Sequence, residues 1–266
     1  MQVPAFARLS PSFDAAPLLA EALALDATEW VAHFNSGYHD GGWYGAALRS
    51  PGGDAARLYS GGAPSAGFAD TPLLARCPAI GAVLDHVRAP LRAVRLLRLA
   101  PGSVIREHRD DDLRFDEGHA RLHVPIATGD AVEFYVDGTR VGMRAGECWY
   151  LDLSRPHRVQ NLGVQDRIHL VIDCEVSEWL EREVAGAAPA TGRPPGISGQ
   201  ESFVRFRERV HADAALTQRL LAVTQPDAFM GLAVELGRQN GFAFGVEDVR
   251  SAMAQGRRSW ILQWII

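Results

Sequence analysis

Three side chains in this sequence have the types and spacing of a metal-binding site. His108 and Asp110 are two residues apart, so in a strand their side chains would point to the same face. His157 follows later, between two strand-like runs. Two imidazoles and one carboxylate form the facial triad that holds iron in non-haem Fe(II) oxygenases and leaves other positions open. The three residues therefore predict a mononuclear iron site, with zinc as the alternative metal because the same ligand types also bind Zn(II).

A cation that could serve this site comes shortly after His157. Arg167 lies in the apolar segment Asp166–Leu170, where a strand is expected. A guanidinium makes paired, charge-assisted hydrogen bonds to a carboxylate. We expect Arg167 to bind the far carboxylate of a 2-oxoglutarate cosubstrate, and its position favours iron over zinc.

Further candidates share a strand face with these residues. Arg121 and His123 are two apart, and Arg121 is a candidate for gripping a substrate carboxylate because a buried arginine is costly unless paired. His123 is explained equally well as a hydrogen-bonded core histidine. His169 shares the face of Arg167 and could line the same cavity. Other cations that could face the pocket are Arg95, Arg98 and Arg114.

The remaining histidines and aromatic residues carry weaker signals. Five histidines lack ligand spacing and are expected to pack in the core or lie on the surface: His33, His39, His86, His119 and His211. Three aromatic residues could wall the pocket, although such residues are usually core: Trp43, Trp149 and Tyr150.

Composition excludes several classes of function. The 266-residue chain has a net charge of −5 and a pI of about 6.0, which gives no sign of nucleic-acid binding. All 27 basic residues are arginine, so lysine-dependent chemistry is excluded. The three scattered cysteines do not suggest disulfides and fit a reducing cytoplasm. We expect neither a signal peptide nor a membrane span.

The elements that must position the site are mostly strands. Helices are expected near residues 14–34 and within 72–87, the latter with its core at 80–87. A short strand is expected at 46–48, and further short strands separated by glycine turns run from about 93 to 175. Asp137-Gly138 predicts a hairpin turn. The pattern predicts an antiparallel jelly-roll, a cupin-like double-stranded β-helix, in which alternate side chains converge on a central cavity.

The C-terminal part has a different composition. Residues 1–184 are assigned to the jelly-roll domain, 185–200 to a Pro/Gly/Ala-rich linker, and 201–266 to a small all-α domain. Ser202 and Asp213 are expected to cap its first two helices, and Asp227 to open a third that Gly241 ends. The apolar residues 260–266 are expected to pack on a neighbouring domain or subunit.

Residues 26–176 resemble the aspartyl/asparaginyl β-hydroxylase family, which includes free-proline hydroxylases. The resemblance rests on an ordered series of motifs, among them Val94–Leu99 followed by Pro101-Gly102-Ser103, Ile105-x-Glu107-His108-Arg109-Asp110, Arg121–Ile126, Gly146-Glu147-x-Trp149-Tyr150, Pro156–Val159 and Arg167–Asp173. The resemblance implies a double-stranded β-helix that uses Fe(II), 2-oxoglutarate and O₂. It implies His108 and His157 as ligands, Arg167 on the cosubstrate, and Arg121 and His123 near cosubstrate or substrate. Because Asp110 is present, the chain resembles the branch with three ligands.

Residues 201–250 resemble the leader domain of nif-type ribosomal peptide precursors. The similarity rests on Ser202-x-x-x-Phe206, Asp213-x-x-Leu216, Ala233-x-x-Leu236-Gly237 and Gly241-Phe242-x-Phe244. It implies a link to peptide-modifying pathways and a peptide precursor as a partner. The alternative is a plain helical extension that packs on the barrel.

Two functional hypotheses follow. The first is a 2-oxoglutarate-dependent dioxygenase that hydroxylates an aspartyl, asparaginyl or prolyl side chain, free or in a peptide, and converts 2-oxoglutarate to succinate. The second is a non-catalytic, cupin-like scaffold or sensor that binds a metal or a small acid.

Overall fold

The computed structural model divides into two compact units, residues 1–194 and 195–266, which are described separately. It describes residues 3–33, 37–39, 41–58, 67–110, 112–187, 199–240, 242 and 244–255. The predicted linker falls largely on residues 188–198, and the predicted apolar tail on 260–266, so both lie outside the described residues. No helix in the described ranges is long and apolar enough to cross a membrane.

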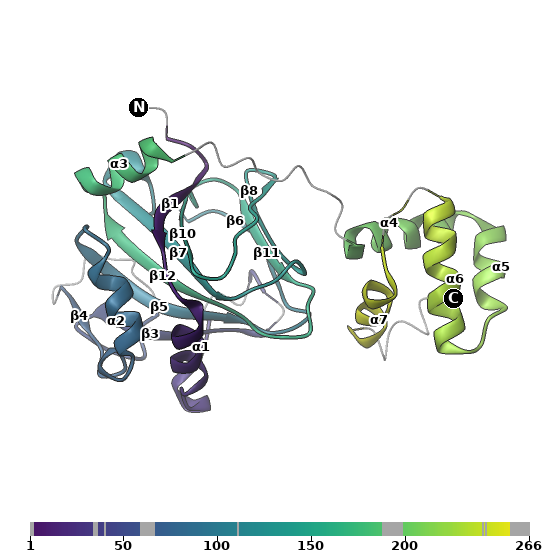
Figure 1. Ribbon diagram of the computed structural model, residues 1–266, viewed down its shortest axis with the longest axis horizontal. Coiled ribbons are helices and arrows are strands. Elements are labelled where there is room, and N and C mark those ends of the chain that lie inside the picture. Colours follow the sequence, from purple (N-terminus) through teal and green to yellow (C-terminus); the bar gives the residue numbers. More distant parts are fainter. Residues whose placement is uncertain are drawn as a thin grey trace. The chain divides into compact units, whose positions relative to one another are not determined.

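The first unit contains two antiparallel sheets (Figure 1). The larger sheet has the order β1-β10-β7-β12-β5-β3-β2, with β4 beside β3. Its strands are β1 (Phe6–Ser12), β2 (Val31–Ala32), β3 (Trp43–Pro51), β4 (Phe68–Asp70), β5 (Leu91–Leu99), β7 (His119–Ala127), β10 (Glu147–Leu151) and β12 (Arg167–Glu175). The smaller sheet has the order β6-β11-β8-β9 and consists of β6 (Val104–His108), β11 (His157–Asn161), β8 (Val132–Val136) and β9 (Thr139–Arg140). The prediction of a double-stranded β-helix is confirmed.

Strict alternation along the long strands separates two hydrophobic cores. In β12 the even-numbered residues from Ile168 to Cys174 join the core beneath the helices, whereas Val171 joins the core between the two sheets. The same parity holds in β7, where Leu122, Val124 and Ile126 pack on the helix side. Side chains of the opposite parity, Arg167 and Arg121 among them, therefore face the space between the sheets.

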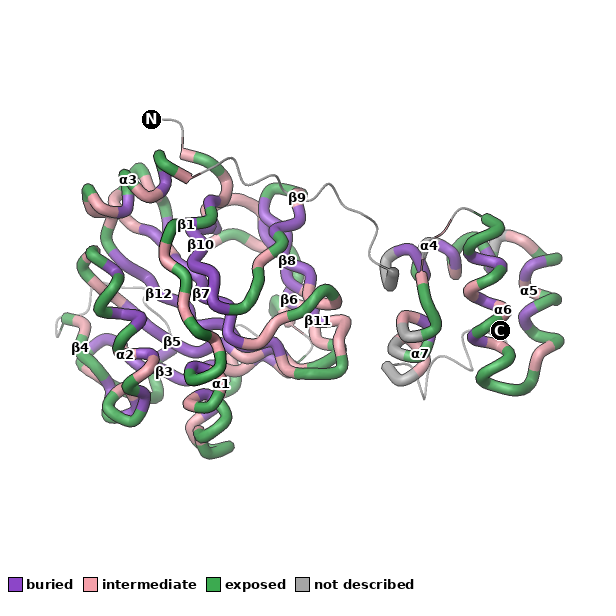
Figure 2. Tube along the Cα trace, in the orientation of Figure 1, coloured by how far each residue is buried: buried purple, intermediate pink, exposed green. Residues whose placement is uncertain are grey.

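Helices cover the outer face of the larger sheet. They are α1 (Ala15–Leu23), α2 (Pro78–Asp85) and α3 (Glu178–Gly186), and each contributes buried residues to the helix-side core. Figure 2 shows the long strands buried along most of their length, while the helices keep one exposed face. Short 3₁₀ turns lie at Ala27–Glu29, Leu74–Arg76 and Phe115–Glu117.

The turn at Asp137 and Gly138 has the backbone geometry that its sequence predicts. Asp137 and Gly138 both have positive φ angles, 50° and 72°, and join the paired strands β8 and β9. This is the geometry of a two-residue hairpin with a type I′ turn, so the predicted turn is confirmed.

Three element predictions were wrong in extent. The helix expected over residues 14–34 ends at Leu23. A separate 3₁₀ turn follows it, and a capping box formed by Asp26 and Glu29 starts that turn. The helix expected over 72–87 is a 3₁₀ turn followed by α2, with Pro78 at its first position. The short strand expected at 46–48 is part of the nine-residue β3.

The described part of the second unit contains four helices built around their own core. The helices are α4 (Gly199–Ala212), α5 (Ala214–Leu221), α6 (Pro226–Gln239) and α7 (Val246–Gln255), and buried phenylalanine and leucine side chains join them. Asp213 caps α5, accepting from the backbone N–H groups of Ala215 at 3.0 Å and Leu216 at 3.2 Å, as predicted. Ser202 lies inside α4 and is not its cap, so that prediction was wrong.

The third helix of this unit also differs from expectation. Helix α6 starts at Pro226 with Gln225 at the N-cap position, so Asp227 lies in its first turn, where a carboxylate suits the helix dipole. The helix ends at Gln239, and the predicted terminator, residue 241, is outside the described residues.

Candidate metal centre and cosubstrate cavity

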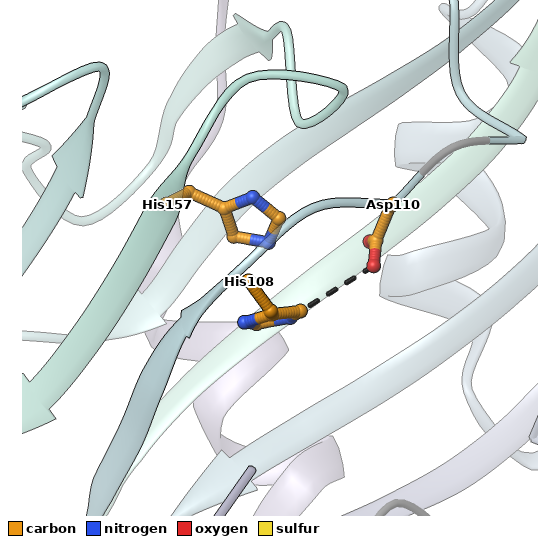
Figure 3. A group of neighbouring side chains, drawn as sticks. All are labelled: His108, Asp110 and His157. Atoms are coloured by element: carbon orange, nitrogen blue, oxygen red, sulfur yellow. Dashed lines mark ion pairs between the residues drawn. The ribbon is translucent and has the colours of Figure 1, made fainter.

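The three predicted metal ligands meet at one end of the smaller sheet. His108 is the last residue of β6, and it lies directly opposite His157, the first residue of β11, in the antiparallel register. Asp110 follows β6, and its backbone N–H donates to the Leu153 carbonyl at 2.9 Å. One ligand atom from each of the three side chains lies within 4.8 Å of the others (Figure 3). The group can therefore surround a single cation.

The backbone orients both imidazoles for ligation. His108 Nδ1 lies 2.8 Å from the Arg106 carbonyl oxygen, and His157 Nδ1 lies 3.0 Å from the Arg155 carbonyl oxygen. A carbonyl accepts only from a protonated nitrogen, so each ring carries a proton on Nδ1, and Nε2 is the nitrogen left for a metal. Burial lowers the pKa of His157 to about 4, which leaves that ring neutral at pH 7. Metal ions bind neutral imidazoles, and the ring nitrogen that does not bind the metal usually donates a hydrogen bond.

Asp110 presents one oxygen to the imidazoles and the other to an arginine. Asp110 Oδ1 lies 3.8 Å from His108 Nε2, a contact that Figure 3 marks with a dashed line. Asp110 Oδ2 accepts from Arg121 Nη1 at 2.5 Å. Burial alone would raise the pKa of Asp110, but Arg121, with smaller contributions from the two histidines, lowers it below its usual value. Asp110 is therefore ionised, with Oδ1 left for a metal.

A second buried carboxylate completes this charge network. Asp173 accepts from Arg121 Nε at 2.5 Å and from Arg121 Nη2 at 3.0 Å, because the two residues are directly opposite in the pairing of β12 with β7. Asp173 also accepts from Arg95 Nη1 at 3.0 Å. Burial would raise the pKa of Asp173, yet the two arginines hold it far below its ordinary value. All three nitrogens of Arg121 thus contact Asp110 or Asp173, and the two arginines balance the two carboxylates.

These groups line a cavity of about 320 Å³ between the two sheets. Apolar side chains form much of its wall, including Leu97, Ile105 and Phe134. Charged and polar residues that line it are His33, Tyr38, His108, Asp110, Asp112, His157, Arg95, Arg109, Arg121, His123 and Arg167. The structure therefore brings together the triad, Arg167, Arg121 and His123, as the sequence analysis anticipated.

Arg167 is the buried cation of this cavity whose charge is least compensated. It is 2% exposed, and among the described residues no carboxylate lies within ion-pair distance of it. Its Nη2 donates to His169 Nδ1 at 2.8 Å, and its Nε has no hydrogen-bond partner. Burial lowers the pKa of Arg167 to about 9, which still leaves it charged at neutral pH. A buried cation without a counter-charge is suited to a carboxylate ligand.

The sequence analysis misjudged several residues around the cavity. His33 was expected to be a packing or surface residue, but it lines the cavity and stacks on Trp43 with ring centroids 3.4 Å apart. Burial lowers the pKa of His33 to about 3. Tyr38, to which the sequence analysis gave no site role, stacks on His108 with centroids 4.7 Å apart. Tyr38 lies in the aromatic segment Gly37–Tyr44, which is the signal that could have found it, and His33 lies just before that segment.

Other candidate cations divide between the cavity and elsewhere. Arg95 lines the cavity, but Arg98 packs over the rings of Trp30 and Tyr44, and Arg114 is paired with Asp116 on the surface. His169 is not in the cavity wall; it lies behind Arg167 and borders a second, wider cavity of about 1160 Å³. Trp149 borders that second cavity too. The three cysteines are free and buried, as expected: Cys77, Cys148 and Cys174.

Comparison with protein families identifies the class to which this fold and site belong. Residues 15–176, more than half of the chain, match the aspartyl/asparaginyl beta-hydroxylase family, and the chain belongs to that family. Residues 200–249 match the Nif11 domain. Both resemblances drawn from the sequence motifs are confirmed.

Proteins similar to this chain include one relative in sequence and two solved structures. An L-proline cis-4-hydroxylase from Rhizobium meliloti (strain 1021) is 30% identical over 176 residues, which cover 64% of this chain and 60% of the relative. Among solved structures, a 2OG-Fe(II) oxygenase family oxidoreductase from Burkholderia pseudomallei is 15% identical with a TM-score of 0.42, covering 60% of this chain and 77% of that chain. A prolyl-4-hydroxylase from Pseudomonas putida is 16% identical with a TM-score of 0.41, covering 65% of this chain and 93% of that chain.

Proposed function

We propose that the chain is an Fe(II)- and 2-oxoglutarate-dependent dioxygenase that hydroxylates an amino-acid side chain. The observation that carries the proposal is the cavity that contains both a His-Asp-His ligand set and the uncompensated cation Arg167, in a member of the β-hydroxylase family. The alternative of a non-catalytic scaffold is not favoured by this family membership.

Each group in the cavity has a role in this proposal. His108, His157 and Asp110 would hold Fe(II), through the two Nε2 atoms and Oδ1, and Arg167 would bind the far carboxylate of 2-oxoglutarate. Iron bound there, with 2-oxoglutarate and O₂, would supply the oxidising power to hydroxylate a C–H bond: one oxygen atom enters the product and the other enters succinate, which forms as 2-oxoglutarate loses CO₂. The apolar wall formed by Leu97, Ile105 and neighbouring side chains excludes water and holds the substrate against the metal.

The substrate class follows from the relatives and the size of the cavity. A relative named as an L-proline hydroxylase and a family named for aspartyl and asparaginyl hydroxylation support an aspartyl, asparaginyl or prolyl side chain, free or in a peptide. A cavity of about 320 Å³ is at the small end of the range for ligand sites, which favours a small substrate. Arg121 and His123 stay candidates for contact with substrate or cosubstrate, although Asp110 and Asp173 already bind Arg121.

The C-terminal unit has a separate role in the proposal. We assign residues 1–184 to the dioxygenase domain and 201–266 to a helical domain that contacts a ribosomal peptide precursor, a partner suggested by the Nif11 match at 200–249. The free cysteines support a reducing compartment, so we propose a cytoplasmic location.

The decisive experiment incubates the full chain with Fe(II), 2-oxoglutarate and candidate substrates in air. Free proline, aspartate and asparagine and short peptides containing them are followed by mass spectrometry for a gain of one oxygen, and succinate is measured in parallel. We expect both products, and their loss in the Asp110→Ala variant. A wild-type rate of succinate formation in that variant would refute the assignment.

The same assay tests the helical domain. A chain that ends at residue 199 is compared with the full chain on free amino acids and on precursor-like peptides. If the helices recruit peptides, the truncation slows only the peptide reaction. Equal rates on both substrates would remove the proposed partner role.

A further inference from the structure

Three buried polar side chains, two of them in the wall of the metal cavity, are connected by short contacts. Arg167 Nη2 donates to His169 Nδ1 at 2.8 Å, and His123 Nδ1 lies 3.3 Å from the same His169 nitrogen. The three residues are 2%, 1% and 3% exposed. Arg167 and His123 line the metal cavity, whereas His169 borders the wider cavity on the other side.

The chemistry of the donors allows one arrangement of protons among these three side chains. A guanidinium only donates, so His169 Nδ1 must carry a lone pair and the His169 proton lies on Nε2. The contact with His123 then needs a proton on His123 Nδ1. Burial, reinforced by the charge of Arg167, lowers the pKa of both rings well below 6.5, so both are neutral at pH 7.

Contacts on two sides fix the guanidinium of Arg167. His169 accepts from Nη2, and the ring of Phe134 lies 5.7 Å from the guanidinium carbon. Arg167 and His169 are two apart in β12, so they share a strand face and the contact needs no distortion of the backbone. An arginine side chain is long and flexible, and a carboxylate binds it best when its planar fork is held in place beforehand.

We propose that His169 is a positioning residue that holds Arg167 ready for the far carboxylate of the cosubstrate, so that His169 sets the affinity for a 2-oxo dicarboxylate. The inference rests on the proposed function of Arg167. It assigns no contact between His169 and any ligand: His169 acts only through Arg167.

Binding measurements on the anaerobic, Fe(II)-loaded protein test this role. Two ligands are compared by calorimetry: 2-oxoglutarate, and pyruvate, which has the same 2-oxo acid but no far carboxylate. His169→Leu removes the acceptor and should weaken 2-oxoglutarate binding about tenfold, the effect of losing one charged hydrogen bond, with pyruvate unchanged. His169→Asn returns an acceptor oxygen near the position of Nδ1 and should recover most of the affinity.

A matched control is available on the same sheet. His119 Nε2 lies 2.7 Å from Arg92 Nη1, an arginine–histidine contact whose residues do not line the metal cavity. His119→Leu should leave 2-oxoglutarate binding unchanged. A tenfold loss in His119→Leu, an equal loss for pyruvate in His169→Leu, or no recovery in His169→Asn would overturn the inference.

A measurement on the unaltered protein keeps the test independent of how the variants fold. Long-range ¹⁵N–¹H correlation spectra report which ring nitrogen carries the proton. We expect His169 protonated on Nε2 and His123 on Nδ1; a proton on His169 Nδ1 would overturn the inference. If the wild-type protein does not bind 2-oxoglutarate at all, the proposed function fails; if it binds and the His169 variants match it, only this inference fails.

Discussion

Two arginines reach the same buried cavity and have opposite electrostatic surroundings. Arg121 contacts two carboxylates, Asp110 and Asp173, and although burial opposes its charge, these partners raise its pKa. Arg167 has no carboxylate partner among the described residues, and burial alone lowers its pKa to about 9. The fold neutralises the first charge by itself and leaves the second for a ligand. The comparison separates a residue that supports the metal ligands from one that is available to bind an anion.

The largest effect should come from removing the neutralised arginine. Arg121→Met leaves Asp173 with only Arg95 and leaves Asp110 Oδ2 without its donor, and loss of one partner from a buried ion pair costs about 3–5 kcal/mol of unfolding free energy. Arg167→Met removes a buried charge that has no counter-ion, so stability should be unchanged or higher. Urea unfolding of the two variants without metal or cosubstrate makes the comparison. Equal losses of unfolding free energy in the two variants would contradict the conclusion that Arg121 is neutralised by its partners and Arg167 is not.

The next effect concerns binding rather than folding. Arg167→Met should weaken 2-oxoglutarate binding by about 1.5–3 kcal/mol, or roughly 10- to 150-fold, because the far carboxylate loses a charged hydrogen-bonding partner. Calorimetry on the anaerobic Fe(II) form gives the dissociation constant. Arg98→Met is the control, since Arg98 packs over Trp30 and Tyr44 and does not line the cavity. Unchanged affinity in Arg167→Met would show that another group binds the carboxylate.

The contrast between these arginines shows how far sequence reasoning reaches. Alternation along β12 and β7 is enough to predict that Arg167, Arg121 and His123 face one cavity, because strand parity is a local property. The partners are not local. Asp173 lies directly opposite Arg121 only through the pairing of β12 with β7, and that register depends on the whole sheet. An acidic residue in an otherwise apolar strand was the available signal, since a buried carboxylate requires a partner.

The same distinction between local patterns and distant contacts applies to the secondary-structure elements. The jelly-roll class and the Asp137-Gly138 turn follow from patterns within a few residues. The strand β1 was missed because its sequence, Phe6–Ser12, mixes polar residues with few apolar ones, and it becomes a strand by pairing with β10. The cavity position of His33 depends on stacking against Trp43, a contact between the ends of two strands that no local pattern shows.

Acid unfolding should separate the buried histidines from the carboxylates by pH. Near Arg167 the titratable groups are His123 and His169, whose pKa values burial lowers well below 6.5. His33 and His157, whose pKa values burial lowers to about 3 and about 4, belong with these histidines. Below pH 6.5 the unfolded chain binds protons that these folded rings exclude, so the unfolding free energy falls as pH falls, by about 1.4 kcal/mol per pH unit for each histidine. Near Arg121 the carboxylates Asp110 and Asp173 have lowered pKa values, so their stabilisation is present above pH 3.8 and is lost only below it.

The variant His169→Leu tests whether His169 contributes to the loss of stability below pH 6.5. Unfolding free energies measured by urea between pH 7.5 and pH 3 should show a shallower slope between pH 6.5 and 5 in this variant, by about one proton. An identical slope in variant and wild type between pH 6.5 and 5 would mean that His169 does not exclude a proton in the folded state.

The smallest effect tests geometry rather than charge. Arg121→Lys keeps the cation, but one ammonium cannot contact Asp110 and both oxygens of Asp173 as the guanidinium does. The Asp110 carboxylate then loses the contact that directs Oδ1 to the metal, and we expect Mn(II) affinity to fall by about 1 kcal/mol, roughly fivefold.

A second buried arginine provides the control for this substitution. Arg140 lies 3.7 Å from the buried Glu133 and does not line the metal cavity, so Arg140→Lys changes a comparable ion pair and should leave Mn(II) affinity unchanged. Equal losses in the two variants would trace the effect to general loosening of the fold. A loss confined to Arg121→Lys would mean that the fork of Arg121, and not merely its charge, orients the acidic metal ligand.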